Sequence, residues 1–135
     1  MNLRLIFGIH RATHRIGLYI QSRAPGFNQA EAHILCHLIE FGDCTIAGLH
    51  SAFAHKRSTL TSVLDRLAAR KLVTREISET DRRSFVVSLT PGGRVKAARI
   101  HRHLEALEAE ALGDTGRKTI ETVERVVEGI GRGVH

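Results

Sequence analysis

The chain has 135 residues, a length that suits one compact domain and leaves little room for a second. Its formal net charge is +6 at pH 7, which favours a polyanionic partner, and its apolar fraction of 42% argues against a disordered chain. No stretch is long and apolar enough to span a bilayer, and basic residues interrupt the apolar start of the chain where a signal peptide would be continuous. We therefore expect a cytoplasmic protein without a membrane partner.

The first part of the sequence predicts three helices. Residues 2–22 carry isoleucines at helical spacing, and Pro25 lies just beyond the end of this segment. Asn28 and Glu31 have the spacing of a capping box, so a second helix should begin there. Thr45 is a suitable N-terminal cap for a short third helix.

A fourth helix is predicted over residues 56–70, and a β-hairpin follows it. At about 100° per residue, four apolar side chains fall on one side of this helix. They are Leu60, Val63, Leu64 and Leu67. Residues 72–77 and 84–89 are then predicted to be two β-strands. The polar loop 78–83 joins them as a hairpin.

Two helices complete the chain. Thr90 is the cap and Pro91 the first residue of a fifth helix, and the glycine-containing segment 113–116 separates it from a last helix. Each outer helix carries an apolar stripe that one small domain covers with difficulty. The stripes either pack on the same chain or, as we favour, form a helical layer shared with a second copy.

The expected fold class is mainly α with a small β-hairpin, a winged helix-turn-helix flanked by N- and C-terminal dimerisation helices. We expect a single winged-helix domain over residues 1–135. Within it, residues 28–90 form the DNA-binding lobe, and residues 2–22 and 92–132 form the dimerisation helices. The expected partners are double-stranded DNA and a second copy of the chain in a homodimer.

The outward face of the fourth helix suits the major groove of DNA. An arginine can bond guanine bidentately, and a serine or threonine hydroxyl can reach a base edge or a phosphate. The residues of this face assigned to DNA are Arg57, Ser58, Thr61, Ser62 and Arg66. The alternative is an ordinary solvated helix face, and the helix alone does not decide between the two.

The hairpin loop strengthens the DNA interpretation. It ends in Asp81, Arg82 and Arg83, and adjacent arginines at the tip of paired strands suit the negative potential of a minor groove. Asp81 is expected to fix one guanidinium by a bidentate bond. The alternative is a solvated turn with a surface ion pair that contributes little.

Four segments together resemble a known family. They are the runs Arg57–Leu67, Lys71–Val73, Asp81–Arg83 and Val87–Gly93, and with the flanking helices they resemble the MarR family of bacterial regulators over nearly the whole chain. The resemblance implies a homodimeric winged-helix transcriptional regulator, more often a repressor than an activator, that binds a palindromic operator. Many members of the family release DNA on binding a small ligand or a metal, or on cysteine oxidation.

The sequence departs from the family pattern around the turn of the helix-turn-helix. His50 stands where a small residue is usual, Ala54 replaces a frequent glycine, and Lys56 stands where a serine or threonine cap is usual. The fourth helix is therefore expected to lack its usual cap.

Nine histidines are many for this length, and two pairs have helical spacing. His10 and His14 lie one turn apart, as do His33 and His37, and Cys36 adjoins the second pair. Such a set suits zinc or copper, so a metal-responsive regulator that uses helix-borne histidines is an alternative function. No obvious four-ligand set is complete, however, and we expect neither a metal nor a cofactor.

The two cysteines, Cys36 and Cys44, are not spaced as a CxxC pair. Cys44 precedes a helix N-terminus, which is expected to lower the pKa of its thiol. Redox-sensing members of the family usually carry the thiol in the first helix, where this chain has none. We therefore favour structural roles for both cysteines.

A small organic effector is the remaining possibility for regulation. Arg11, His14, His33 and His37 are the candidates to hold an anionic ligand between the dimerisation helices and the DNA-binding lobe. The sequence shows no phosphate-binding loop, nucleophile elbow or HExxH motif, so we do not expect an enzyme. A winged-helix adaptor that binds protein without DNA is the other alternative, although the wing arginines argue against it.

Overall fold

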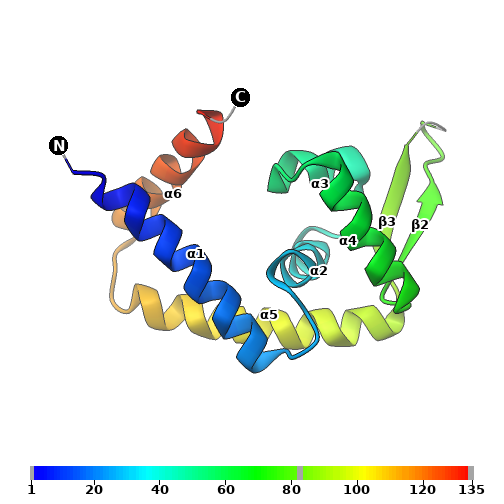
Figure 1. Ribbon diagram of the computed structural model, residues 1–135, viewed down its shortest axis with the longest axis horizontal. Coiled ribbons are helices and arrows are strands. Elements are labelled where there is room, and N and C mark those ends of the chain that lie inside the picture. Colours follow the sequence, from blue (N-terminus) through cyan, green and yellow to red (C-terminus); the bar gives the residue numbers. More distant parts are fainter. Residues whose placement is uncertain (1, 82–83, 134–135) are drawn as a thin grey trace. The chain divides into compact units, whose positions relative to one another are not determined.

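The computed structural model describes residues 2–81 and 84–133. Along the chain its elements are α1 (Arg4–Arg23), α2 (Gln29–Phe41), β1 (Cys44–Thr45), α3 (Ile46–Phe53), α4 (Arg57–Ala69), β2 (Val73–Ile77), β3 (Phe85–Leu89), α5 (Pro91–Leu112) and α6 (Arg117–Arg132) (Figure 1). The chain forms two compact units, residues 1–103 and residues 104–135, and the boundary falls inside α5. Among the described residues, no helix is long and apolar enough to cross a membrane.

The core of the first unit surrounds α2. This helix begins with the predicted capping box: the Asn28 side chain accepts from the Glu31 backbone N–H at 2.8 Å, and the Asn28 backbone N–H donates to Glu31 Oε1 at 2.9 Å. The predicted apolar face of α4 is fully buried, and it shares the core with side chains of α2, α3 and the sheet. The largest of these buried partners are Ile34, Leu35, Leu38, Leu49 and Val87.

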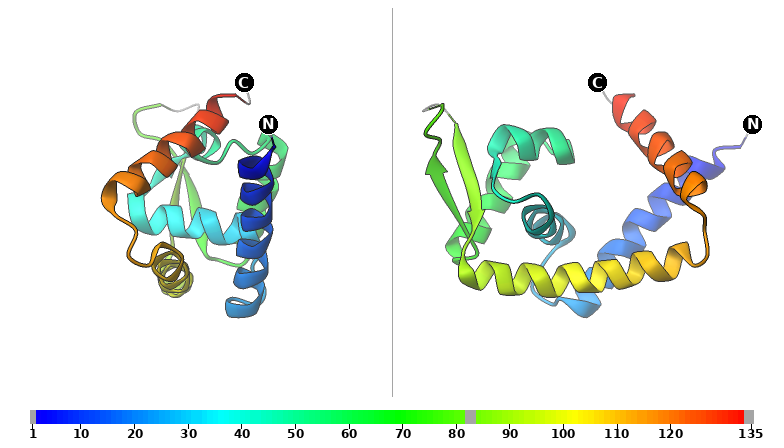
Figure 2. Two further views of the ribbon diagram at one scale, coloured as in Figure 1. Left: turned by 90° about the vertical axis from the view of Figure 1, so that its left-hand side faces the viewer. Right: turned by 180° about the vertical axis from the view of Figure 1, so that it is seen from behind.

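The mainly α winged-helix fold is confirmed, but the sheet has three strands and not only the two of the predicted hairpin. Its order is β1-β3-β2, with Cys44 opposite Val87 and Thr45 opposite Val86. The strand β1 was missed because two residues show no alternation of apolar and polar side chains. β2 and β3 pair antiparallel from Val73–Leu89 to Ile77–Phe85, and the two strands form the wing (Figures 1 and 2).

Thr90 joins the start of α5 to the start of the wing through hydrogen bonds. Its hydroxyl accepts from the Gly93 backbone N–H at 2.9 Å, as a cap does, and donates to the Lys71 carbonyl at 2.7 Å. The Thr90 backbone N–H also donates to the Leu72 carbonyl at 3.0 Å. The predicted Thr-Pro helix start is therefore correct, and the same threonine sets the path of the chain from β3 into α5.

Both ends of the chain expose apolar side chains. In the first unit, α1 exposes Leu5, Ile6, Phe7 and Leu18. In the second unit, no described residue of α6 is buried, and Val123 and Val127 are 56% and 53% exposed. Both helices thus carry exposed apolar side chains within one copy of the chain. On α1, however, Ile20 of the predicted isoleucine stripe is buried, and Ile9 and Ile16 are half-buried.

Candidate nucleic-acid interface

The outward face of α4 presents the polar set predicted for DNA. Arg57, Ser58, Thr61 and Ser62 are all exposed on the first two turns, opposite the buried leucines. The Thr61 hydroxyl donates to the Arg57 carbonyl at 2.9 Å, so its oxygen can still accept a hydrogen bond. This face therefore offers a guanidinium donor and hydroxyl groups along one side of a helix.

The N-terminus of α4 lacks a side-chain cap among the described residues, as the sequence predicts. Lys56 is its N-cap residue, and within the described part of the chain no side chain accepts a cap hydrogen bond there. Ala54 ends α3 in the left-handed region with φ of 54°, the position where glycine is usual. The first backbone N–H groups of α4 thus remain available to an anion, next to Lys56 and Arg57.

The second half of α4 carries charges that bind other parts of the protein. Asp65 accepts from Arg75 Nη1 of β2 at 2.6 Å, which links α4 to the wing. Arg66, predicted as a DNA contact, places its Nε 3.6 Å from Glu31 Oε2. These partners were not predicted, because nothing in the local sequence of α4 indicates which distant side chain faces it.

The wing loop is organised by Ser78, a buried serine that the sequence analysis did not single out. Its hydroxyl oxygen lies 3.3 Å from the backbone nitrogens of Thr80 and Asp81, which donate to it. The Asp81 carbonyl accepts from the Ser84 backbone N–H at 3.0 Å. Arg82 and Arg83 lie outside the described residues, so their assignment to DNA and the expected Asp81–arginine bond stay predictions.

The four residues predicted for an effector come from two helices. Arg11 and His14 are exposed on α1, whereas His33 and His37 are half-buried on α2. The His37 ring lies against Phe41 and Phe53, with ring centroids 4.7 and 5.2 Å apart, and Phe53 stacks on His55 at 5.8 Å. Burial and, to a lesser degree, the neighbouring His55 lower the pKa of His33. His37 thus belongs to an aromatic cluster between α2 and the end of α3, and His33 interacts electrostatically with His55, a member of that cluster.

The lowered pKa of His33 predicts that acid destabilises the protein. The unfolded chain takes up a proton at His33 as the pH falls below about 6.5, whereas the folded chain does so only at a lower pH. The free energy of unfolding should therefore decrease as the pH falls from 6.5 towards the folded pKa. In urea titrations over this range, His33→Gln should reduce this decrease in the free energy of unfolding. A decrease equal to that of the unmodified protein would contradict the assignment.

The histidines and cysteines give little support to metal or redox sensing. Among the residues that the structure describes, no group of three or more His, Cys, Asp or Glu side chains is arranged to hold a metal ion. Burial, with a smaller effect of Glu40, raises the pKa of the Cys36 thiol to about 12. Burial also raises the pKa of Cys44, so the predicted lowering by the following helix is wrong. Both thiols are consequently poor nucleophiles at neutral pH.

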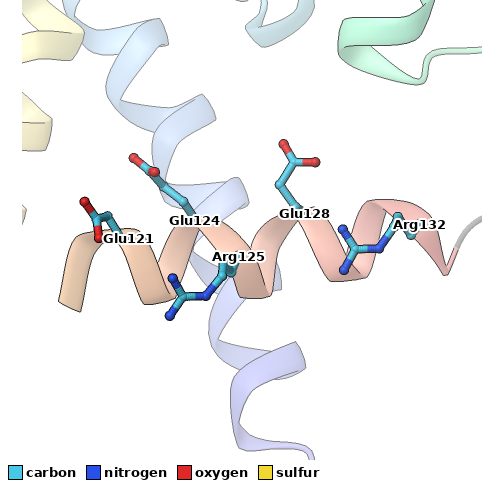
Figure 3. Close-up of a pocket in the computed structure, with 5 residues that line it drawn as sticks. All are labelled: Glu121, Glu124, Arg125, Glu128 and Arg132. Carbon is cyan, nitrogen blue, oxygen red and sulfur yellow. The ribbon is translucent and has the colours of Figure 1, made fainter. Parts of the chain in front are cut away.

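A hollow on the second unit is unrelated to the predicted effector residues. It is lined by Glu121, Glu124, Arg125, Glu128 and Arg132, all from α6 (Figure 3). Figure 3 shows these side chains spread along the surface of one helix, with Glu124 and Glu128 extending away from Arg125. A surface made by one helix does not enclose a ligand, and we assign no site there.

A helix-turn-helix whose recognition helix is followed by a paired β-wing defines a winged-helix DNA-binding protein. Residues 27–85 match the model of the MarR family, which confirms the family predicted from the sequence. The segment from α2 to the start of β3 is therefore similar to a MarR-family domain. None of the curated protein sequences matches the chain significantly.

Solved structures of regulators match nearly the whole chain. BpsR of Bordetella bronchiseptica, whose DNA binding is regulated by 6-hydroxynicotinic acid, is 25% identical with a TM-score of 0.74, over 94% of this chain and 92% of BpsR. A mutant of MarR from E. coli, complexed with operator DNA, is 22% identical with a TM-score of 0.74, over 95% of this chain and 94% of MarR. BldR from Sulfolobus solfataricus is 24% identical with a TM-score of 0.73, over 98% and 93% of the two chains.

Proposed function

We propose that the protein is a homodimeric, ligand-responsive repressor that binds a palindromic operator. The observation that carries this proposal is the exposed face of α4, with Arg57, Ser58, Thr61 and Ser62 beside an uncapped helix N-terminus. Arg57 and the three hydroxyls are assigned to base edges in the major groove, and Asp81, Arg82 and Arg83 to the wing contact in the minor groove. The similarity of the fold to MarR bound to operator DNA supports this arrangement.

The exposed apolar side chains of α1 and α6 support a homodimer, and a two-fold dimer implies an operator with two-fold symmetry. In sedimentation at micromolar concentration, the protein should run at twice the 15.0 kDa chain mass. Val123→Glu with Val127→Glu should shift it toward the monomer because charges do not pack in an apolar interface, whereas Glu124→Gln on the same helix should not. A 15.0 kDa species alone for the unmodified chain would contradict the proposal.

A small organic anion is the proposed effector. Arg11, His14, His33 and His37 remain its candidate ligands, and the regulation of BpsR by 6-hydroxynicotinic acid supports an anionic aromatic compound as the chemical class. Calorimetry with 6-hydroxynicotinate is a direct test. Binding that Arg11→Ala weakens, while Arg99→Ala at an exposed position of α5 does not, would support the site. Equal affinities of both variants would remove Arg11 from it.

We expect DNA release to be independent of both cysteines. Their raised pKa values keep the thiols protonated at neutral pH, and the thiolate is the form that peroxide oxidises. A variant with Cys36→Ser and Cys44→Ser should bind and release the operator as the unmodified protein does. If peroxide releases only the unmodified protein from DNA in a mobility-shift assay, the cysteines are sensors and this prediction fails.

A further inference from the structure

The recognition helix α4 reaches back to the start of α2 through Arg66. Arg66 Nε lies 3.6 Å from Glu31 Oε2, and the side chain of Glu31 is 7% exposed, against 49% for Arg66. The other oxygen of the same carboxylate, Glu31 Oε1, accepts from the Asn28 backbone N–H in the capping box. One buried carboxylate therefore caps α2 and also holds a guanidinium of the recognition helix.

A second arginine, Arg70, follows α4 directly as its C-cap residue and binds the same region. Arg70 Nη1 donates to the Gly26 carbonyl at 2.8 Å, and its guanidinium carbon lies 4.2 Å from the centroid of the buried Phe27 ring. Because residues four apart share one side of a helix, Arg66 and Arg70 extend from the same side of α4. Both reach residues 26–31, which form the turn between α1 and α2 and the first turn of α2.

We propose that Arg66 and Arg70 are positioning residues that hold the recognition helix against the α1–α2 turn, and that Arg66 does not itself bind DNA. The proposal rests on the proposed function and replaces the assignment of Arg66 to DNA. Base recognition by Arg57 and its neighbours requires bidentate geometry, so the axis of α4 must be fixed at the end away from the base contacts. Arg66 and Arg70 hold α4 at that end by their contacts with residues 26–31.

A positioning arginine and a phosphate-binding arginine differ in the salt dependence of binding. Loss of a phosphate contact flattens the slope of log affinity against log salt by about 0.9 and weakens specific and random DNA alike. Loss of a positioning contact leaves the number of phosphate contacts unchanged and lowers only the affinity for the specific site. The same loss should follow from changing Glu31, a buried acidic residue that cannot contribute an attractive contact to DNA.

The test compares Glu31→Gln, Arg66→Gln and their combination on the selected operator and on random duplex over a salt series. Glu31→Gln keeps an amide oxygen for the Asn28 N–H and removes only the charge. We expect each single variant to lose affinity for the operator on the order of tenfold, about one base contact, with the random affinity and the salt slope unchanged. The double variant should lose little more, because both changes remove one interaction.

Arg99→Gln, at an exposed position of α5, controls for the loss of one positive charge. It should change neither the ratio of operator affinity to random-DNA affinity nor the salt slope. Far-ultraviolet circular dichroism checks that each variant is folded; if Glu31→Gln is not, Arg70→Met provides the second test with the same expected result. A flatter slope for Arg66→Gln together with unchanged binding by Glu31→Gln would overturn the proposal. If the unmodified protein itself prefers no duplex over random DNA, the proposed function fails instead.

Discussion

Replacing Gly93 with alanine is expected to destabilise the protein more than the same change at any other glycine of the chain. A Cβ at this position would lie 1.8 Å from the Leu72 carbonyl oxygen and 2.7 Å from its carbonyl carbon. These are backbone atoms at the start of the wing, so a rotamer change cannot move them away. Overpacking of this kind costs about 3 kcal/mol or more, a large part of the stability of a small domain.

The neighbouring glycine provides a matched control for this prediction. A Cβ on Gly92 would meet only Thr90 Oγ1, at 3.9 Å, which is ordinary contact. Because alanine has the higher helix propensity, Gly92→Ala should be neutral or stabilise the protein by up to about 1 kcal/mol. Urea unfolding of the two variants measures the difference. Equal midpoints would mean that α5 does not start against Leu72 as described.

The second large effect is expected at the DNA interface, where α4 and the wing should contribute differently. Arg57→Ala should cost about 1–3 kcal/mol on the best site and relax the preference at one base position, because a bidentate arginine discriminates between bases. Arg82→Ala or Arg83→Ala should instead weaken binding to all sequences and flatten the salt dependence by about one phosphate contact. Asp81→Ala should reproduce part of the wing loss, since it frees the arginine that the carboxylate is expected to hold.

Binding of these variants to specific and random duplexes over a salt series separates the two contributions. The Lys96→Ala variant, at an exposed position of α5, controls for charge alone. If the wing variants leave both affinities and the salt slope unchanged, the wing does not contact DNA and its assignment is wrong. If Arg57→Ala weakens random and specific DNA equally, α4 binds the backbone without reading bases.

Sequence periodicity and capping predicted the framework of this fold because both are local. Asn28 with Glu31, Thr45 and Thr90 lie at helix starts, and each side chain makes the cap hydrogen bond that its residue type favours. The buried side of α4 follows in the same way from residues three and four apart. Its outward residues were therefore also predictable, since they are the remainder of a helix whose inner face is known.

The parts that were missed depend on contacts between distant segments. Strand β1 exists because Cys44 and Thr45 pair with β3, and two residues carry no pattern of their own. The effect of the following helix on the Cys44 thiol was overestimated, because burial of its side chain has the larger effect on the pKa. The partner of Arg66 is a buried carboxylate on another helix, which the pattern of α4 alone does not indicate.

Selection of binding sites from random duplex DNA with the purified protein tests the central claim most directly. A dimeric regulator that reads bases with α4 should enrich an inverted repeat whose half-sites lie about one helical turn apart. The most strongly preferred positions should be those that Arg57→Ala relaxes when the selection is repeated with that variant. A folded protein whose selected pool stays random after repeated rounds would contradict the account, as would enrichment that Arg57→Ala leaves unchanged.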